Sequence, residues 1–166
     1  MTSDVANNAV RHRYGATALH LAAGANYAKL VSLLLARGAD VGARDLRGWT
    51  PLMWAAVGVN CGAARPGLRP VRCGGGGSGG GVGQPALEIN QLKTIKILMS
   101  SGADAEAADW VDAERPLAVA VRANRADVVA ALLKKGVRFA ARNQRGQSPH
   151  DLAVNLQYWD IANILE

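Results

Sequence analysis

The feature that most restricts the fold of this sequence is a motif that recurs with a period near 33 residues. Four short segments resemble one another, and their first residues stand 33, 65 and 33 positions apart. These first residues are Thr17, Thr50, Arg115 and Ser148. A glycine after a leucine-rich stretch recurs in the same way, at Gly38, Gly102 and Gly136. The period indicates stacked helical units, one of which is about twice the usual length.

Three of the four units begin with a residue type that caps helices. Thr or Ser at the cap accepts a hydrogen bond from the first helical turn, and Pro at the next position loses no bond there. Asn26 and Asn124 then interrupt the apolar pattern, and Asn tolerates the left-handed conformation of a chain reversal. We therefore expect two antiparallel helices per unit, followed by a hairpin. The residues assigned to capping are Thr17, His20, Thr50, Pro51 and Ser148.

The motifs within the units resemble the ankyrin repeat. Gly-Ala-Asp-Val at 38–41, Gly-Trp-Thr-Pro-Leu at 48–52 and Gly-Ala-Asp at 102–104 stand at the spacing of that family. The resemblance covers about 14–58 and 90–166, and it implies an all-α ankyrin-repeat solenoid. The third unit departs from the family pattern, because Arg115 replaces a capping Thr and the hairpin before it lacks the turn glycine and has one extra residue.

The period divides the chain into four units. The predicted divisions are a remnant hairpin at 1–13, repeat 1 at 14–47, repeat 2 at 48–109 interrupted by 59–89, repeat 3 at 110–143 and an incomplete repeat 4 at 144–166. The partial units at both ends suggest a fragment of a longer array or an imperfect gene model.

The interruption of repeat 2 is a glycine-rich insertion. Residues 59–89 hold 10 of the 19 glycines, and removing them joins Gly58 to Asn90 and restores Asn at the helix break. Composition predicts a disordered loop; a basic partner-binding loop and retained intron sequence are the alternatives. The glycines follow no predicted strand, which disfavours a phosphate site. The two cysteines, Cys61 and Cys73, have no nearby histidine, which disfavours zinc.

Charge and composition narrow the class of protein. The net charge is +6, but the cations are scattered, with no run longer than Lys134-Lys135. Nucleic-acid surfaces usually cluster their cations, so nucleic acid is a disfavoured partner. No apolar run reaches about 18 residues and no leader pattern opens the chain, so we expect no membrane contact and an intracellular protein of the cytoplasm or nucleus.

Catalytic chemistry is not apparent in the sequence. No serine lies in a nucleophile-elbow motif, and His20 occupies the third position of a capped helix, where a bond back to Thr17 explains it. The sequence therefore predicts no enzyme, no catalytic residue, no metal site and no cofactor.

With catalysis disfavoured, recognition of another molecule by the protein surface is the remaining kind of function. The resemblance implies that the hairpin tips and the short-helix face bind another protein. The predicted function is a non-catalytic scaffold, adaptor or regulatory module, either a monomer or part of a larger chain. A nucleic-acid-associated regulator and a fragment without independent function are the alternatives. The residues assigned to partner binding are Arg44, Leu46, Arg47, Trp49, Trp110, Glu114, Gln144, Arg145 and Gln147.

Within this set, two residue types carry distinct expectations. Trp49 and Trp110 are expected to be exposed anchors, although each could instead fold back to fill its own hairpin, as the irregular hairpin of Trp110 favours. Trp54 and Trp159 are expected to pack. A positive face made by Arg44, Arg47, Arg142 and Arg145 would favour an acidic partner.

Overall fold

The computed structural model describes residues 15–58 and 85–166, and for residues 85–89 it describes the backbone only. This part of the chain contains eight helices and no strand. The helices are α2 (Ala18–Gly24), α3 (Ala28–Ala36), α4 (Pro51–Val57), α5 (Pro85–Ser100), α6 (Pro116–Arg122), α7 (Ala126–Leu133), α8 (Pro149–Asn155) and α9 (Trp159–Ile164). They form four antiparallel pairs, and the all-α solenoid expected from the period is confirmed.

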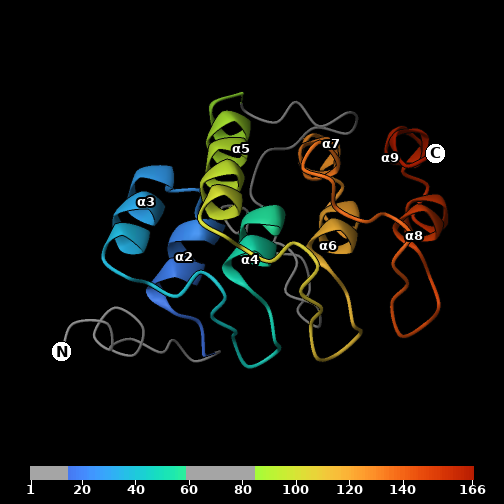
Figure 1. Cartoon of the computed structure of the whole chain (residues 1–166). Coiled ribbons are helices and arrows are strands. Elements are labelled where there is room, and N and C mark those ends of the chain that lie inside the picture. Colours follow the sequence, from blue (N-terminus) through green and yellow to red (C-terminus); the bar gives the residue numbers. More distant parts are fainter. Residues whose placement is uncertain (1–14, 59–84) are drawn as a thin grey trace, which may run out of the picture.

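The helix pairs stand side by side in one row. The short helices α2, α4, α6 and α8 form one layer, α3, α5, α7 and α9 form the other, and each helix contacts the next in its layer. The hairpins project from the short-helix side and lie along a common edge (Figure 1). Because each pair contacts only its neighbours, the fold is a linear array.

The turns within the pairs have the backbone conformation that the sequence predicts. Asn26 and Asn124 adopt φ of 59° and 54°, and Gln157 takes the same place in the last pair with φ of 60°. Gly38 follows α3 with φ of 84°, as expected for a residue that ends a helix in the left-handed region.

Side chains cap three of the four short helices. Thr17 and His20 form a reciprocal capping box at the start of α2, and Ser148 and Asp151 form another at the start of α8. Hydrogen bonds from Ser148 hold the pKa of Asp151 below its usual value. Thr50 accepts the Met53 N–H at 3.4 Å, whereas Arg115 makes no side-chain cap. The third unit therefore lacks a contribution of about 1 kcal/mol.

The last residues of the predicted coil are helical. Helix α5 begins at Pro85, so residues 85–89 of the predicted coil are helical, and the rest of it, 59–84, lies outside the described residues together with the predicted remnant hairpin at 1–13. Pro favours the first helical position, and Ala86, Leu87 and Glu88 are good helix formers, so the helix extends beyond the repeat boundary.

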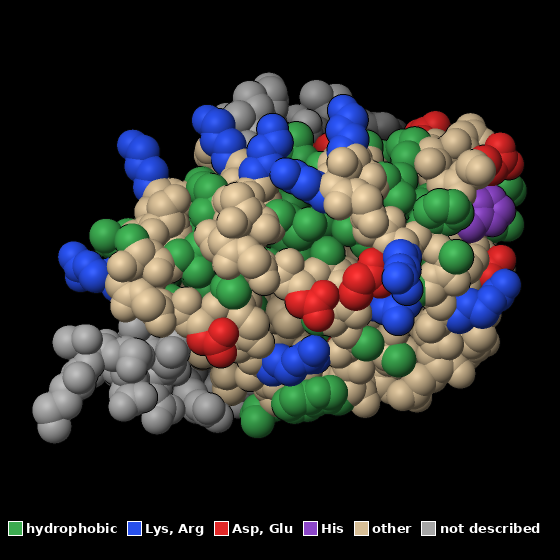
Figure 2. All heavy atoms as spheres, in the orientation of Figure 1, with side chains coloured by type: hydrophobic (Ala, Val, Ile, Leu, Met, Phe, Trp, Pro, Cys, Tyr) green, Lys and Arg blue, Asp and Glu red, His purple; other side chains and the backbone are tan. Residues whose placement is uncertain are grey.

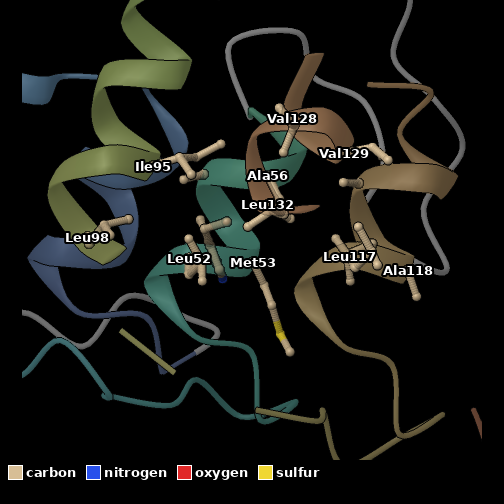
Figure 3. Packing of buried hydrophobic residues seen from close by; sticks show 14 of the residues in the cluster. Leu52, Met53, Ala56, Ile95, Leu98, Leu117, Ala118, Val128, Val129 and Leu132 are labelled. Carbon is tan, nitrogen blue, oxygen red and sulfur yellow. The ribbon is translucent and has the colours of Figure 1, made fainter. Parts of the chain in front are cut away.

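The hydrophobic core runs through the row of pairs without a break. Figure 3 shows Ile95 and Leu98 of α5 beside Leu52 and Met53 of α4, and Leu132 of α7 belongs to the same cluster of buried residues. Full burial of one such side chain contributes about 1.5–3 kcal/mol. Trp54 belongs to this core as expected, but the expectation for Trp159 is wrong, because 61% of its surface is exposed on α9.

Candidate protein-interaction surface

Neighbouring hairpins are joined by main-chain hydrogen bonds. The Trp110 N–H donates to the Arg47 carbonyl at 3.0 Å, and the Gln144 N–H donates to the Asp112 carbonyl at 2.9 Å. These bonds place the three tips in a row, and we call the row the hairpin-tip surface. Its residues are Leu46, Arg47, Trp110, Val111, Gln144 and Arg145.

One buried polar side chain fixes the shape of each hairpin. Asp45, Asp109 and Asn143 occupy equivalent places, and all three are buried. One oxygen of each accepts two backbone N–H groups from its own loop, at 2.9–3.1 Å. Loops held in this way are rigid, so little conformational freedom is lost when a partner binds them.

Large apolar side chains project from the tips. Leu46, Trp110 and Val111 are exposed, with 61% of the Trp110 surface open to solvent, and Figure 2 shows apolar side chains at the lower edge below the first hairpins. Trp110 covers Gly48, where an added Cβ would come within 2.7 Å of the indole carbons. Leu46 covers Gly15 in the same way, at 2.9 Å. Leu46 and Trp110 thus each rest on a glycine of the preceding turn.

A methyl group at Gly48 is expected to displace Trp110. Gly48 has φ of 82°, so an alanine there is strained by about 1–3 kcal/mol. Its added methyl group would also clash with the indole ring of Trp110. Gly102→Ala is the matched control, because Gly102 has φ of 89° and open space around it. We expect Gly48→Ala to lower the unfolding free energy further than Gly102→Ala in urea titrations. Equal losses would contradict the contact with Trp110.

The arginines assigned to an acidic partner are largely engaged within the protein. Arg142 lies 3.3 Å from Asp151, and Arg145 lies 3.7 Å from Asp112. Arg44 donates to the carbonyls of Gly48 and Ala108, at 2.9 and 2.6 Å. The middle hairpin, residues 104–115, contains five acidic residues and only Arg115. The sequence-based prediction therefore overestimated how much unpaired positive charge this face carries.

Two further residues of the predicted set are not on the surface. Only 8% of Trp49 is exposed, and its indole N–H donates to Asp109 at 3.1 Å. Glu114 is also buried and lies 2.6 Å from Arg122. Burial raises the pKa of Glu114, and the Arg122 guanidinium offsets part of that rise. The expectation that both side chains face a partner is wrong, because each fills a polar niche beneath the hairpins.

The remaining predicted residues lie where a partner can reach them. Arg44, Leu46, Trp110, Gln144 and Arg145 are exposed, and Arg47 and Gln147 are half-buried. Sequence reasoning missed that Arg44 serves the main chain, and it undervalued the loop-shaping role of Asp45, Asp109 and Asn143. Their recurrence at separations of 64 and 34 was the available signal.

Two further features of the described residues concern clusters of metal ligands and helices that could span a membrane. Within 15–58 and 85–166, no three His, Cys, Asp or Glu side chains come together as metal ligands. Across the same ranges, no helix combines the length and apolar character needed to cross a bilayer.

Comparisons with known proteins agree with the geometry. Residues 3–64 match a family model described as ankyrin repeats (3 copies). Protein phosphatase 1 regulatory subunit 12A of Mus musculus and of Rattus norvegicus are each 50% identical over 48 residues, which is 28% of this chain and 5% of each relative. The Homo sapiens protein of the same name is 50% identical over 45 residues, which is 26% of this chain and 4% of the relative. The chain therefore matches only a small part of each relative's length.

Proposed function

Because the chain belongs to the ankyrin repeat family, we propose that it is a protein-interaction module whose hairpin-tip surface binds a partner protein. The observation that carries this proposal is the exposed pair Leu46 and Trp110, each resting on a glycine of the preceding turn. Tryptophan is among the residues that contribute most binding energy at interfaces. The partner would supply an apolar pocket for the indole.

The charge pattern of the surface supports a partner with mixed charge. Arg145 is compensated by Asp112, and the neighbouring hairpin carries its own acidic residues. Association by this surface would then depend on apolar contact more than on electrostatic steering. We expect the association rate to change only modestly between low and physiological salt.

A scaffold or regulatory role is the finer part of the proposal. The relatives reported above are by name regulatory subunits of protein phosphatase 1, and the similarity covers a short stretch at 50% identity. The catalytic subunit of that phosphatase is therefore the first defined protein whose binding to the full chain should be tested.

The test compares two exposed aromatic residues. Trp110→Ala removes the proposed anchor, whereas Phe139→Ala removes an exposed aromatic side chain that follows Gly136, away from the tips. We expect Trp110→Ala to weaken binding of the phosphatase subunit, or of proteins captured from a cell lysate, by about tenfold or more. Phe139→Ala should leave that binding unchanged. Equal effects of the two variants, or retention on heparin at physiological salt as the main binding activity, would contradict the proposal.

A further inference from the structure

The lysines of the chain are confined to the outer layer of helices, on the side opposite the hairpins. All of them lie on α3, on α5 or at the end of α7, and all are exposed. Among the described residues, none forms an ion pair. Figure 2 shows basic side chains along the upper edge, where Figure 1 places the outer helices. These lysines are Lys29, Lys93, Lys96, Lys134 and Lys135.

Two of these lysines occupy equivalent places in neighbouring repeats. Lys29 and Lys93 each stand nine residues before the glycine that ends the helix. Helices α3 and α5 contact each other, and packed helices lie about 8–10 Å apart, so the two ammonium groups project from the same height on adjacent helices. The equivalent residue of α7 is Asp127, which lies 3.5 Å from Arg125. The basic row therefore belongs to α3 and α5.

A groove lies between these two helices, and we call it the outer groove. It encloses about 400 Å³ and reaches from the outer helices to the first hairpin. Apolar side chains form most of its lining, and two exposed serines accompany them. The residues that matter for binding are Ser32, Leu35, Ala36, Val41, Ile97 and Ser101.

The lysines border the outer groove along both helices. Lys93 precedes Ile97 by four residues, and Lys29 precedes Ser32 by three. Residues three or four positions apart lie on the same face of a helix, one turn from each other. The two lysines therefore stand one turn from residues that line the groove, one on each side of it.

The helices that form the groove carry charge of one sign. Residues 28–37 and 90–101 contain four basic residues and no acidic residue. The first hairpin adds Asp40, whose carboxylate accepts the Gly42 N–H at 2.9 Å. A ligand in the outer groove would meet apolar side chains in the groove and positive charge on both helices beside it.

We propose that the outer groove binds an acidic amphipathic segment of a partner protein, with its apolar side chains in the groove and its carboxylates toward Lys29 and Lys93. Charge complementarity favours this occupant. It disfavours the other segments of this chain, because residues 1–14 and 59–84 together contain five arginines and one acidic residue. The proposal goes beyond the function proposed above, since it concerns the opposite side of the protein from the hairpin-tip surface.

An acidic protein segment suits the outer groove better than a nucleic acid or a lipid bilayer. Nucleic-acid surfaces cluster many cations against phosphates, whereas here a few lysines flank apolar side chains. A bilayer presents a broad surface that does not enter a groove between two helices. A helical segment with an apolar stripe fits such a groove and can carry carboxylates beside the stripe.

The first test measures binding of a designed peptide to the full chain by fluorescence anisotropy. The peptide carries leucines at helical spacing and glutamates beside them. We expect it to bind at least about tenfold more tightly than a peptide with Lys in place of every Glu, and to bind more weakly as salt is added. A peptide with Ser in place of every Leu should also bind about tenfold more weakly. Equal binding of the acidic and basic peptides would overturn the proposal.

The second test reverses the charge beside the groove. Lys29→Glu together with Lys93→Glu should weaken binding of the acidic peptide by about tenfold or more. Lys134→Glu together with Lys135→Glu is the matched control, because it makes the same change of charge at two exposed lysines beyond α7. Circular dichroism verifies folding, and Lys29→Gln with Lys93→Gln replaces a reversal variant that does not fold. Equal effects of the two pairs would show that net charge alone governs binding, and the proposal would fail.

The third test separates the outer groove from other surfaces and other ligands. Ser32→Trp narrows the groove without a change of charge and should weaken binding of the acidic peptide, whereas Trp110→Ala on the hairpin tips should leave it unchanged. The proposal is overturned if Trp110→Ala weakens binding as much as the reversal beside the groove. It is also overturned if double-stranded DNA, or vesicles containing phosphatidylserine, bind the full chain more tightly than the acidic peptide at physiological salt.

Discussion

Replacing Trp49 with alanine is expected to lower the unfolding free energy of the full chain by about 3–5 kcal/mol. The side chain fills the core beneath the hairpins, and its indole N–H is bonded to the buried carboxylate of Asp109 at 3.1 Å. Removal leaves a cavity and takes a partner from that carboxylate, which also orders the hairpin at residues 109–114. Urea denaturation followed by circular dichroism measures the loss.

Two control variants separate the contributions of Trp49. Trp49→Phe keeps most of the volume and removes the N–H, so we expect a loss of about 1–3 kcal/mol. Trp110→Ala truncates a tryptophan that is exposed and should change the unfolding free energy by less than about 1 kcal/mol. If Trp49→Ala were as mild as Trp110→Ala, the assignment of Trp49 to the core would be wrong. If Trp49→Ala binds a partner more weakly, we therefore attribute the loss to reduced folding and not to a lost surface contact.

His20 is the second residue whose removal is expected to have a large effect. Its Nδ1 accepts the Thr17 N–H at 3.1 Å, and its Nε2 lies 2.9 Å from the Trp49 carbonyl, to which it donates. His20→Ala removes the capping box and leaves a buried carbonyl without its donor. The two losses together are expected to cost about 2–3 kcal/mol. Thr17→Ala, which affects the cap alone, should cost about 1 kcal/mol.

The stabilisation by His20 is also expected to depend on pH. Burial lowers the pKa of His20 from its usual 6.5, so the unfolded chain binds a proton in a range where the folded chain does not. The difference in unfolding free energy between the unmodified protein and His20→Ala should be constant above pH 6.5 and should shrink as the pH falls below it. Glu114, whose pKa is raised, contributes the opposite dependence on pH. Because both proteins contain Glu114, its contribution cancels when their unfolding free energies are subtracted. Parallel pH profiles for the two proteins would contradict the prediction.

Local features of the fold could be predicted because they depend on residues close in sequence. A cap involves residues three positions apart, as at Thr17 and His20, and a left-handed turn depends on the single residue that adopts it, as at Asn26. The recurrence of these signals set the number and order of the helices. The start of α5 was missed because a repeat boundary does not limit helix propensity.

The surface could not be predicted to the same degree. Trp49 stands four residues after Asp45, whereas Trp110 stands one residue after the equivalent Asp109, yet sequence reasoning treated the two alike. The hairpin between Asp109 and Arg115 has one residue more than that between Asp45 and Thr50, and Ala113 within it adopts φ of 53°. In the folded chain, Trp110 lies outside over Gly48 while Trp49 lies inside against Asp109.

The sequence by itself thus determined the period, the helix ends and the class of fold, because near neighbours along the chain specify them. The tertiary structure decided which tryptophan is exposed and which arginines are engaged within the protein. Burial depends on partners from other units, such as Asp109, which lies 60 positions from Trp49 in the sequence. Such contacts are set by packing between units, which no short stretch of sequence specifies.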